Sequence, residues 1–266
     1  MRFLILFFSV LLYASIGQIQ EIKGKVDVLR SDKVIHAKKG FSVDVNDTVF
    51  TYQNSKAKIV FKDNTIITIG QNSTFKIKDY VYGKKPKARF SFLKGSFVSV
   101  TGKIGKIAPK RFKLETKNAS IGIRGTIVFG QLYFGGDIVG CSSGLISVAK
   151  GGKTVLVKPG EMVGVFGNVL TKPLKVSYGY LKSVFNSLSL SPGEIKSFFG
   201  KIIPSFSYSN VSVNQKISAK ENNESNISSN LSWENYKIEK LNTPKTKQFK
   251  AIIFDNGLQF ENLKYK

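Results

Sequence analysis

Short stretches in which apolar and polar residues alternate dominate the first two thirds of the chain. Ile59 and Phe61 would share one face of a strand, Ile67 and Ile69 one face of the next, and residues 62–64 would turn between them. The pattern therefore predicts two adjacent antiparallel strands with a common apolar face.

The same alternation recurs from Gly24 to Leu170, separated by turn-forming residues. Gly151 and Gly152 stand between two alternating runs, as in a two-residue hairpin turn, and residues 135–137 mark another turn. We find roughly fourteen strand candidates in this span and no convincing helix. The fold class that we predict is all-β.

The apolar period changes within residues 176–203. Apolar residues recur at intervals of three and four, first at Leu181, Val184, Phe185 and Leu188, and then at Ile195, Phe198, Phe199 and Ile202. Between the two groups, Ser191 and Glu194 have the spacing of a capping box, with Pro192 at the first helical position. We expect two short helices whose apolar stripes cap an open end of the β-domain.

The remaining residues divide into a polar segment and a final pair of strands. Residues 204–246 are rich in serine, asparagine and lysine, which predicts a flexible linker. In residues 247–266, two alternating runs flank Asn256-Gly257, a strong hairpin signal. Because a lone hairpin is marginally stable in water, we expect it to dock on the main domain or on a partner.

The N-terminus has the three parts of a secretory signal peptide. Arg2 is followed by an apolar run at 3–12, and then by small residues that include Ala14 and Gly17. We predict a signal peptide at 1–17, with cleavage after Ala14 or Gly17, and a β-domain at 18–175. No later stretch is apolar for long enough to predict a transmembrane helix. The protein is then periplasmic or secreted, with the cell surface left open.

Composition adds a strong positive charge to this picture. The chain has 266 residues, is 42% hydrophobic and carries a formal net charge of +24. Such a charge points to nucleic acid, an anionic membrane surface or an anionic polymer. Predicted export and the lack of a nucleic-acid-binding motif exclude nucleic acid as the expected partner.

Residues for catalysis or for metal binding are scarce. His36 is the only histidine and lies in a lysine-flanked loop where we expect nothing to pair with it, and Cys141 is the only cysteine. One histidine and one cysteine cannot form a tetrahedral zinc site, and turn roles explain Asp44 and Asp47. We expect no enzyme activity, no cofactor, no metal and a buried Cys141, which by itself allows no intramolecular disulfide.

Several motifs together resemble the FecR domain family, from Gly24 to Phe166. They are Gly24-Lys25-Val26, Asn46-Asp47-Thr48, the run from Ser55 to Gly70, Leu93 to Phe97, the signature from Phe112 to Thr126, and Gly144 to Glu161. The sequence departs from the family at Lys117-Asn118, where a proline often precedes the alanine. The resemblance implies stacked short strands and hairpins in a solenoid-like or sandwich-like domain.

The resemblance also implies a class of partner. FecR proteins are similar to periplasmic sensors that receive a signal from a TonB-dependent receptor of the outer membrane. Those sensors carry an anti-sigma segment and a membrane helix before this domain, where this sequence has a predicted signal peptide. We therefore expect a non-enzymatic interaction or signalling module that binds an envelope protein, without carrying over sigma-factor control; the oligomeric state is left open.

The closing signature contains an arginine between glycines, at Gly122, Arg124, Gly125 and Thr126. The glycines allow close backbone approach, and a guanidinium has five donors that can bind carbonyls at a turn. We interpret Arg124 as a structural strut, with ligand binding as the alternative.

Two basic stretches support a different class of function. They are residues 82–90 and 102–113, in which lysines and arginines are abundant. The candidate contacts to an anionic partner are Lys84, Lys85, Lys87, Arg89, Lys110 and Arg111. Such clusters are suited to bind an acidic envelope polymer, lipopolysaccharide or peptidoglycan. They are equally consistent with a solvent-exposed face that only keeps the protein soluble.

The predicted linker contains a candidate modification site. Asn226 lies in an N-x-S sequon with Glu224 two residues before it, as in the extended acceptor of bacterial N-glycosylation. A similar pattern around Asn46 falls in a predicted β-turn, where we expect lower accessibility.

Overall fold

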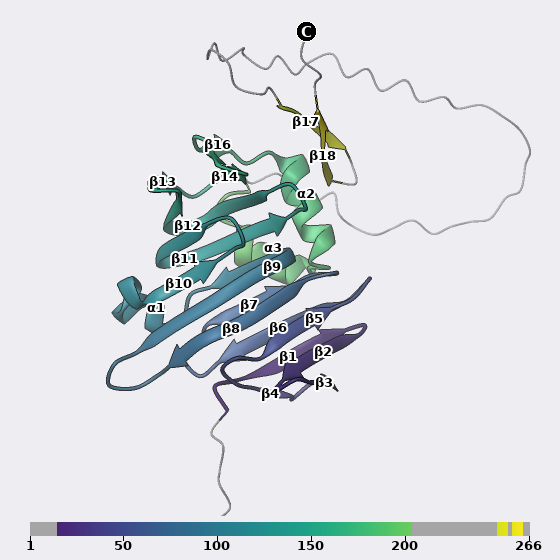
Figure 1. Ribbon diagram of the computed structural model, residues 1–266, viewed down its shortest axis with the longest axis vertical. Coiled ribbons are helices and arrows are strands. Elements are labelled where there is room, and N and C mark those ends of the chain that lie inside the picture. The colour runs from purple at the N-terminus through teal and green to yellow at the C-terminus, as the bar shows by residue number, and fades with distance from the viewer. Residues whose placement is uncertain (1–14, 204–248, 255–256, 263–266) are drawn as a thin grey trace, which may run out of the picture. The chain divides into compact units, whose positions relative to one another are not determined.

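The computed structural model describes residues 15–203, 249–254 and 257–262 (Figure 1). They belong to two units, one within residues 1–204 and one within 205–266. Residues 1–14 of the predicted signal peptide and the whole predicted linker, which includes Asn226, lie outside the described residues.

The first unit contains one mixed sheet of sixteen strands among the described residues. Its strands are β1 (Gly17–Lys23), β2 (Val26–Arg30), β3 (Lys33–His36), β4 (Ser42–Val43), β5 (Thr48–Thr51), β6 (Lys56–Phe61), β7 (Ile66–Ile69), β8 (Thr74–Val81), β9 (Lys87–Val100), β10 (Phe112–Glu115), β11 (Ser120–Leu132), β12 (Asp137–Lys150), β13 (Lys153–Val157), β14 (Glu161–Phe166), β15 (Val169–Leu170) and β16 (Leu174–Lys175). The predicted all-β class is confirmed.

The strand pairings arrange this sheet in two layers. Layer one runs β3-β2-β5-β8 and continues through the first half of β9, β10, the start of β11, the end of β12 and β13. Layer two runs β4-β1-β6-β7 and continues through the second half of β9, the end of β11, the start of β12 and β14. The chain passes repeatedly from one layer to the other, so the domain is a sandwich formed from one continuous sheet.

Three long strands, β9, β11 and β12, cross from one layer to the other. Gly95 lies between the two halves of β9 with φ of 89°, and Gly144 lies at the bend of β12 with φ of 83°. A Cβ on Gly144 would stand 2.5 Å from the carbonyl oxygen of Gly125 in the adjacent strand. Glycine is therefore needed at this bend for both its conformation and its size.

One apolar cluster fills the space between the layers. Phe61 of layer two contacts Phe90 of layer one with ring centroids 4.7 Å apart, and Phe92 stacks on Phe97 across the bend of β9 at 3.7 Å. Ile59 is also fully buried here, as the alternating pattern predicted.

A short helical excursion interrupts the strands, where we expected no helix. After β9 the chain forms α1 (Lys103–Ile107) and the 3₁₀ turn η1 (Pro109–Arg111) before it enters β10. A helix of five residues is too short to show a recognisable apolar period, which explains the wrong prediction. It is held by tertiary contacts, because Ile104 is fully buried.

The two predicted helices are confirmed as α2 (Tyr178–Ser187) and α3 (Pro192–Phe199), with the capping box in place. They do not cap an open end of the domain. Phe129, on the outer face of layer two, contacts Tyr180 and Phe199 with ring centroids 6.4 and 5.2 Å away. The helices lie against this face (Figure 1). They cover it because β11 has buried apolar side chains on both of its faces.

The second unit contains the predicted hairpin. β17 (Phe249–Phe254) and β18 (Gly257–Asn262) pair antiparallel, with Phe254 opposite Gly257. Its docking stays a prediction.

Candidate functional site

The two basic stretches come together because β9 and β10 are parallel neighbours. Phe112 lies opposite Ala88 and Lys113 opposite Arg89. A parallel pair needs a crossover, and here the crossover is the second half of β9 with α1 and η1. Side chains from the start of each strand therefore meet at one end of layer one.

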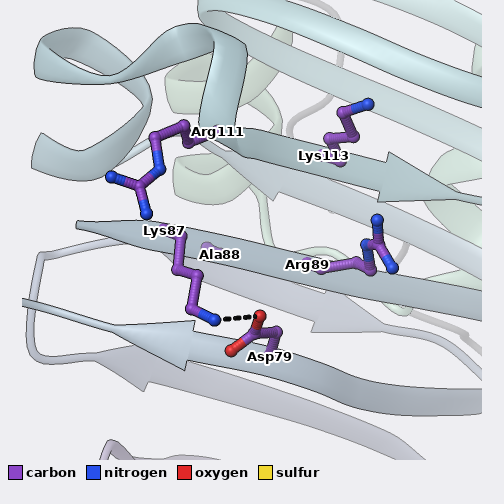
Figure 2. A pocket seen from close by; sticks show the side chains of 6 residues that line it. All are labelled: Asp79, Lys87, Ala88, Arg89, Arg111 and Lys113. Carbon is purple, nitrogen blue, oxygen red and sulfur yellow. Dashed lines mark ion pairs between the residues drawn. The ribbon is translucent and has the colours of Figure 1, made fainter. Parts of the chain in front are cut away.

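A shallow depression of about 240 Å³ lies at this position, on the outer face of layer one. Figure 2 shows its lining residues, which come from β8, β9, η1 and β10: Asp79, Lys87, Ala88, Arg89, Arg111 and Lys113. We call this the cationic depression, since four of its six residues are lysine or arginine.

Carboxylates neutralise only part of this charge. Lys87 pairs with Asp79 at 2.7 Å, and Arg89 pairs with Glu115 at 3.2 Å. Glu115 also pairs with Lys78 at 2.7 Å. Among the described residues, no carboxylate lies within 4 Å of the cationic groups of Arg111 and Lys113, so the depression retains a positive charge that suits an anionic ligand.

A buried network centred on Asp63 positions the segment that supplies Arg111. The Asp63 carboxylate accepts a hydrogen bond from the backbone N–H of Ile104 at 3.0 Å, at the start of α1. It also accepts from the Tyr80 hydroxyl at 3.0 Å, and burial raises the pKa of Tyr80. Because Asp63 is fully buried, its hydrogen bonds hold the start of α1 firmly against the sheet.

Some of the predicted contacts to an anionic partner line the depression and others do not. Lys87, Arg89 and Arg111 do, whereas Lys84, Lys85 and Lys110 are exposed beside it. Lys113 was not among the predicted contacts, although it ends the second basic stretch and its alternation with Phe112 and Leu114 placed it on the outer face of a strand.

The arginine of the signature segment is not the strut that we expected. Arg124 is exposed, and within the described residues its guanidinium makes no hydrogen bond or ion pair. The strut is formed instead by Thr101, whose hydroxyl donates to the Thr126 carbonyl at 2.8 Å and accepts from the Thr126 N–H at 3.2 Å. Gly122 lies opposite Lys113, and Arg124 lies two residues further along β11. The side chain of Arg124 is therefore on the same face of the sheet as that of Lys113 and adds positive charge there.

His36 has a partner, contrary to expectation. Its Nδ1 lies 2.9 Å from the carboxylate of Asp27, which also accepts from the Tyr52 hydroxyl at 2.8 Å. Burial alone would raise the pKa of Asp27, but the hydrogen bonds from His36 and Tyr52 hold it below its ordinary value. The antiparallel register of β2 and β3 creates this pair, which a sequence pattern does not reveal.

Other candidate chemistry is sparse in the part of the chain that the structure describes. No group of three or more histidine, cysteine, aspartate or glutamate side chains there could hold a metal ion. Cys141 is buried, as predicted, and burial raises the pKa of its thiol to about 11. No described helix combines the length and apolarity that a membrane crossing needs.

Residues 47–151 match the family model described as "FecR protein". This part of the chain has the sequence pattern of a FecR domain. The matched residues run from just before β5 to just after β12, and they include the cationic depression and the signature segment. The FecR resemblance of the sequence is thereby confirmed.

Among solved structures, the chain is similar to two crystal structures of "a putative anti-sigma factor" from Parabacteroides distasonis, at 1.65 and 2.50 Å, with 10% sequence identity to each. The first similarity covers 51% of this chain and 63% of that chain, so the chain spans less than two thirds of it, with a TM-score of 0.42. The second covers 57% and 74%, with a TM-score of 0.44. No curated protein matches the chain.

Proposed function

We propose that this FecR-domain protein is a non-enzymatic sensing and interaction module of the bacterial envelope. The observation that carries the proposal is the FecR match over residues 47–151, since a FecR domain supports a signalling or sensing role. The matched residues include an exposed site with surplus charge, which is suited to recognition. Catalysis needs positioned acids, bases or nucleophiles, and the cationic depression offers one carboxylate that is already paired.

The envelope location in this proposal rests on the N-terminal sequence. Arg2 and the apolar run at 3–12 have the pattern of a cleaved signal peptide. The mature protein is then periplasmic, secreted or at the cell surface. Its partner is an envelope protein, with a TonB-dependent receptor or another outer-membrane component as the first candidates.

Site-directed photo-crosslinking in cells tests the partner. A crosslinking amino acid replaces Lys113 in the depression or, as the control, Lys153 on β13, which is also exposed. We expect the Lys113 position to form a covalent product with one envelope protein, identified by mass spectrometry, and the Lys153 position to form none. A product from Lys153 alone would place the interaction elsewhere.

The surplus charge favours a second candidate function, the binding of an anionic envelope polymer. Unpaired Arg111 and Lys113 can bind phosphate or carboxylate groups of lipopolysaccharide or peptidoglycan. Binding to each purified polymer should weaken steeply between about 0.05 and 0.5 M salt, because screening shortens the reach of the charges.

Two charge-neutralising double variants make this test specific. Arg111→Gln/Lys113→Gln should lose most of the binding, whereas Lys150→Gln/Lys153→Gln, with the same change in net charge on another hairpin, should retain it. Equal loss in both variants would show attraction by net charge rather than a site.

A further inference from the structure

Two loop tips project from the same end of layer one, beside the cationic depression. One is the β8–β9 connection, residues 82–86, and the other is formed by α1 and η1 (Figure 1). Val81 lies opposite Lys87 in the β8–β9 pair, and Ala88 lies opposite Phe112, directly after η1. The two tips are therefore adjacent.

The tips expose apolar side chains to solvent. Ile107 at the end of α1 is 67% exposed, and Val81 and Tyr82 are 42% and 43% exposed. Neighbouring residues of the same segments are well buried, Ile104 at 0% and Tyr80 at 5%. Each tip is thus anchored by a buried side chain and carries its exposed apolar side chains beyond that anchor.

Every charged residue between Tyr80 and Leu114 is a lysine or an arginine. Lys84 and Lys85 follow Tyr82, and Lys106 and Lys110 flank Ile107; all four are exposed. Apolar side chains surrounded by cations on adjacent tips are the arrangement of an interfacial membrane anchor.

We propose that these two tips form a docking surface for an anionic phospholipid bilayer. Val81, Tyr82 and Ile107 would enter the headgroup region, where the tyrosine ring is favoured because it is apolar with a polar edge. The lysines would reach the lipid phosphates, with their aliphatic stems along the apolar side chains. An anionic polymer would use the cations but would not bury the three apolar side chains, and this difference favours the bilayer.

The local structure is organised in advance for such docking. Asp63 accepts a hydrogen bond from the start of α1, and the Lys103 N–H donates to the Asp63 carbonyl at 2.7 Å. Pro86 and Pro109 restrict the backbone of the two tips. Little conformational entropy is therefore lost when the tips meet a surface.

Vesicle co-sedimentation of the full exported chain tests the proposal, which does not depend on the identity of the protein partner. We expect binding to phosphatidylcholine vesicles that contain about one third phosphatidylglycerol, and weak binding to pure phosphatidylcholine. Val81→Ser/Tyr82→Ser/Ile107→Ser should reduce the affinity by about tenfold or more, because apolar burial is lost while the charge is kept. Val34→Ser/Leu156→Ser is the matched control, since these residues are 67% and 57% exposed on edge strands, and it should bind as the unchanged protein does.

A fluorescence measurement separates insertion from electrostatic adhesion. Trp233, the only tryptophan of the chain, is first replaced by phenylalanine. In that background, the fluorescence emission of Tyr82→Trp should shift to shorter wavelength when anionic vesicles are added, and the emission of Val34→Trp should not. Absence of vesicle binding overturns the proposal. So does full binding by the triple serine variant, which would instead indicate recognition of phosphate by charge alone. Photo-crosslinking at Lys113 reports the protein partner independently of either result.

Discussion

Single residues of the signature segment have roles that depend on which side of the strand they occupy. Thr126 is buried and bonded to Thr101, whereas Arg124 is exposed on the outer face of layer one. The hydroxyl that bridges two strands therefore carries the structural role, and the guanidinium is available to a ligand.

Substitution of these residues should separate the two roles. Thr101→Val should lower the free energy of unfolding by about 1–3 kcal/mol, because the Thr126 N–H loses a buried acceptor. Arg124→Ala should change it by less than about 0.5 kcal/mol, as is usual for an exposed residue, while it reduces retention on an anionic polymer. Urea unfolding measures both; a large loss of stability in Arg124→Ala would restore the strut interpretation.

At the scale of elements, the bends of the long strands and the attachment of α3 determine how the layers and helices meet. Each bend needs a backbone conformation that most residues rarely adopt. The attachment of α3 relies on an ion pair beneath a helix N-terminus, where Lys56 Nζ lies 2.8 Å from Glu194 Oε2.

The bend of β12 should tolerate no side chain. Gly144→Ala should cost about 2 kcal/mol or more, because φ is 83° and the new Cβ would meet the Gly125 carbonyl. Gly179→Ala is the control: a Cβ there meets no atom within 4 Å, and alanine favours the helix that contains it. Thermal unfolding should show opposite shifts in the two variants, and equal shifts would contradict the role of the bend.

The ion pair between Glu194 of α3 and Lys56 should make the free energy of unfolding depend on pH. Burial alone would raise the pKa of Glu194, but the ammonium of Lys56 and the backbone N–H of Ser191 hold it below its ordinary value of 4.5. A carboxyl with a lowered pKa stabilises the fold above its unfolded pKa, and that contribution is lost as the pH falls through the folded value. Glu194→Gln should therefore be less stable at pH 7 by about 1–3 kcal/mol, with the difference shrinking below pH 4.5.

Urea unfolding across this pH range measures the effect. Asp79→Asn is the control, since it breaks a pair whose side chains are about 40% exposed and should cost less than about 1 kcal/mol. A difference between Glu194→Gln and the unchanged protein that stays constant down to pH 3 would mean that Glu194 acts only by packing.

At the scale of the whole molecule, the proposed export must leave the sandwich intact. β1 begins at Gly17, which lies opposite Val43 and Phe61, and the Ile16 N–H donates to the Val43 carbonyl at 3.1 Å. Of the two predicted cleavage positions, the one after Ala14 keeps these contacts. N-terminal sequencing of the exported protein should therefore begin at Ser15; a start at Gln18 would show that the first residues of β1 are dispensable.

Glycosylation of Asn226 stays a prediction. Its sequon lies in the predicted linker, whereas in the similar pattern at Asn46 the following residues, Asp47 and Thr48, are buried. We expect the intact mass of the native protein to exceed that of the processed chain, and Asn226→Gln to remove the excess. An excess that persists in this variant would place the modification elsewhere.

The amino-acid sequence by itself determined the all-β class, the two later helices with their capping box, the hairpin, the burial of Cys141 and the FecR resemblance. These depend on local periodicity, turn chemistry and side-chain polarity, which act over a few neighbouring residues. Only the tertiary structure decided which strands cross between layers, where the helices pack, that Asp27 pairs with His36, and that Lys113 joins Lys87, Arg89 and Arg111 in one depression. Such contacts follow from strand register over long sequence separations, and a local pattern carries no information about register between distant strands.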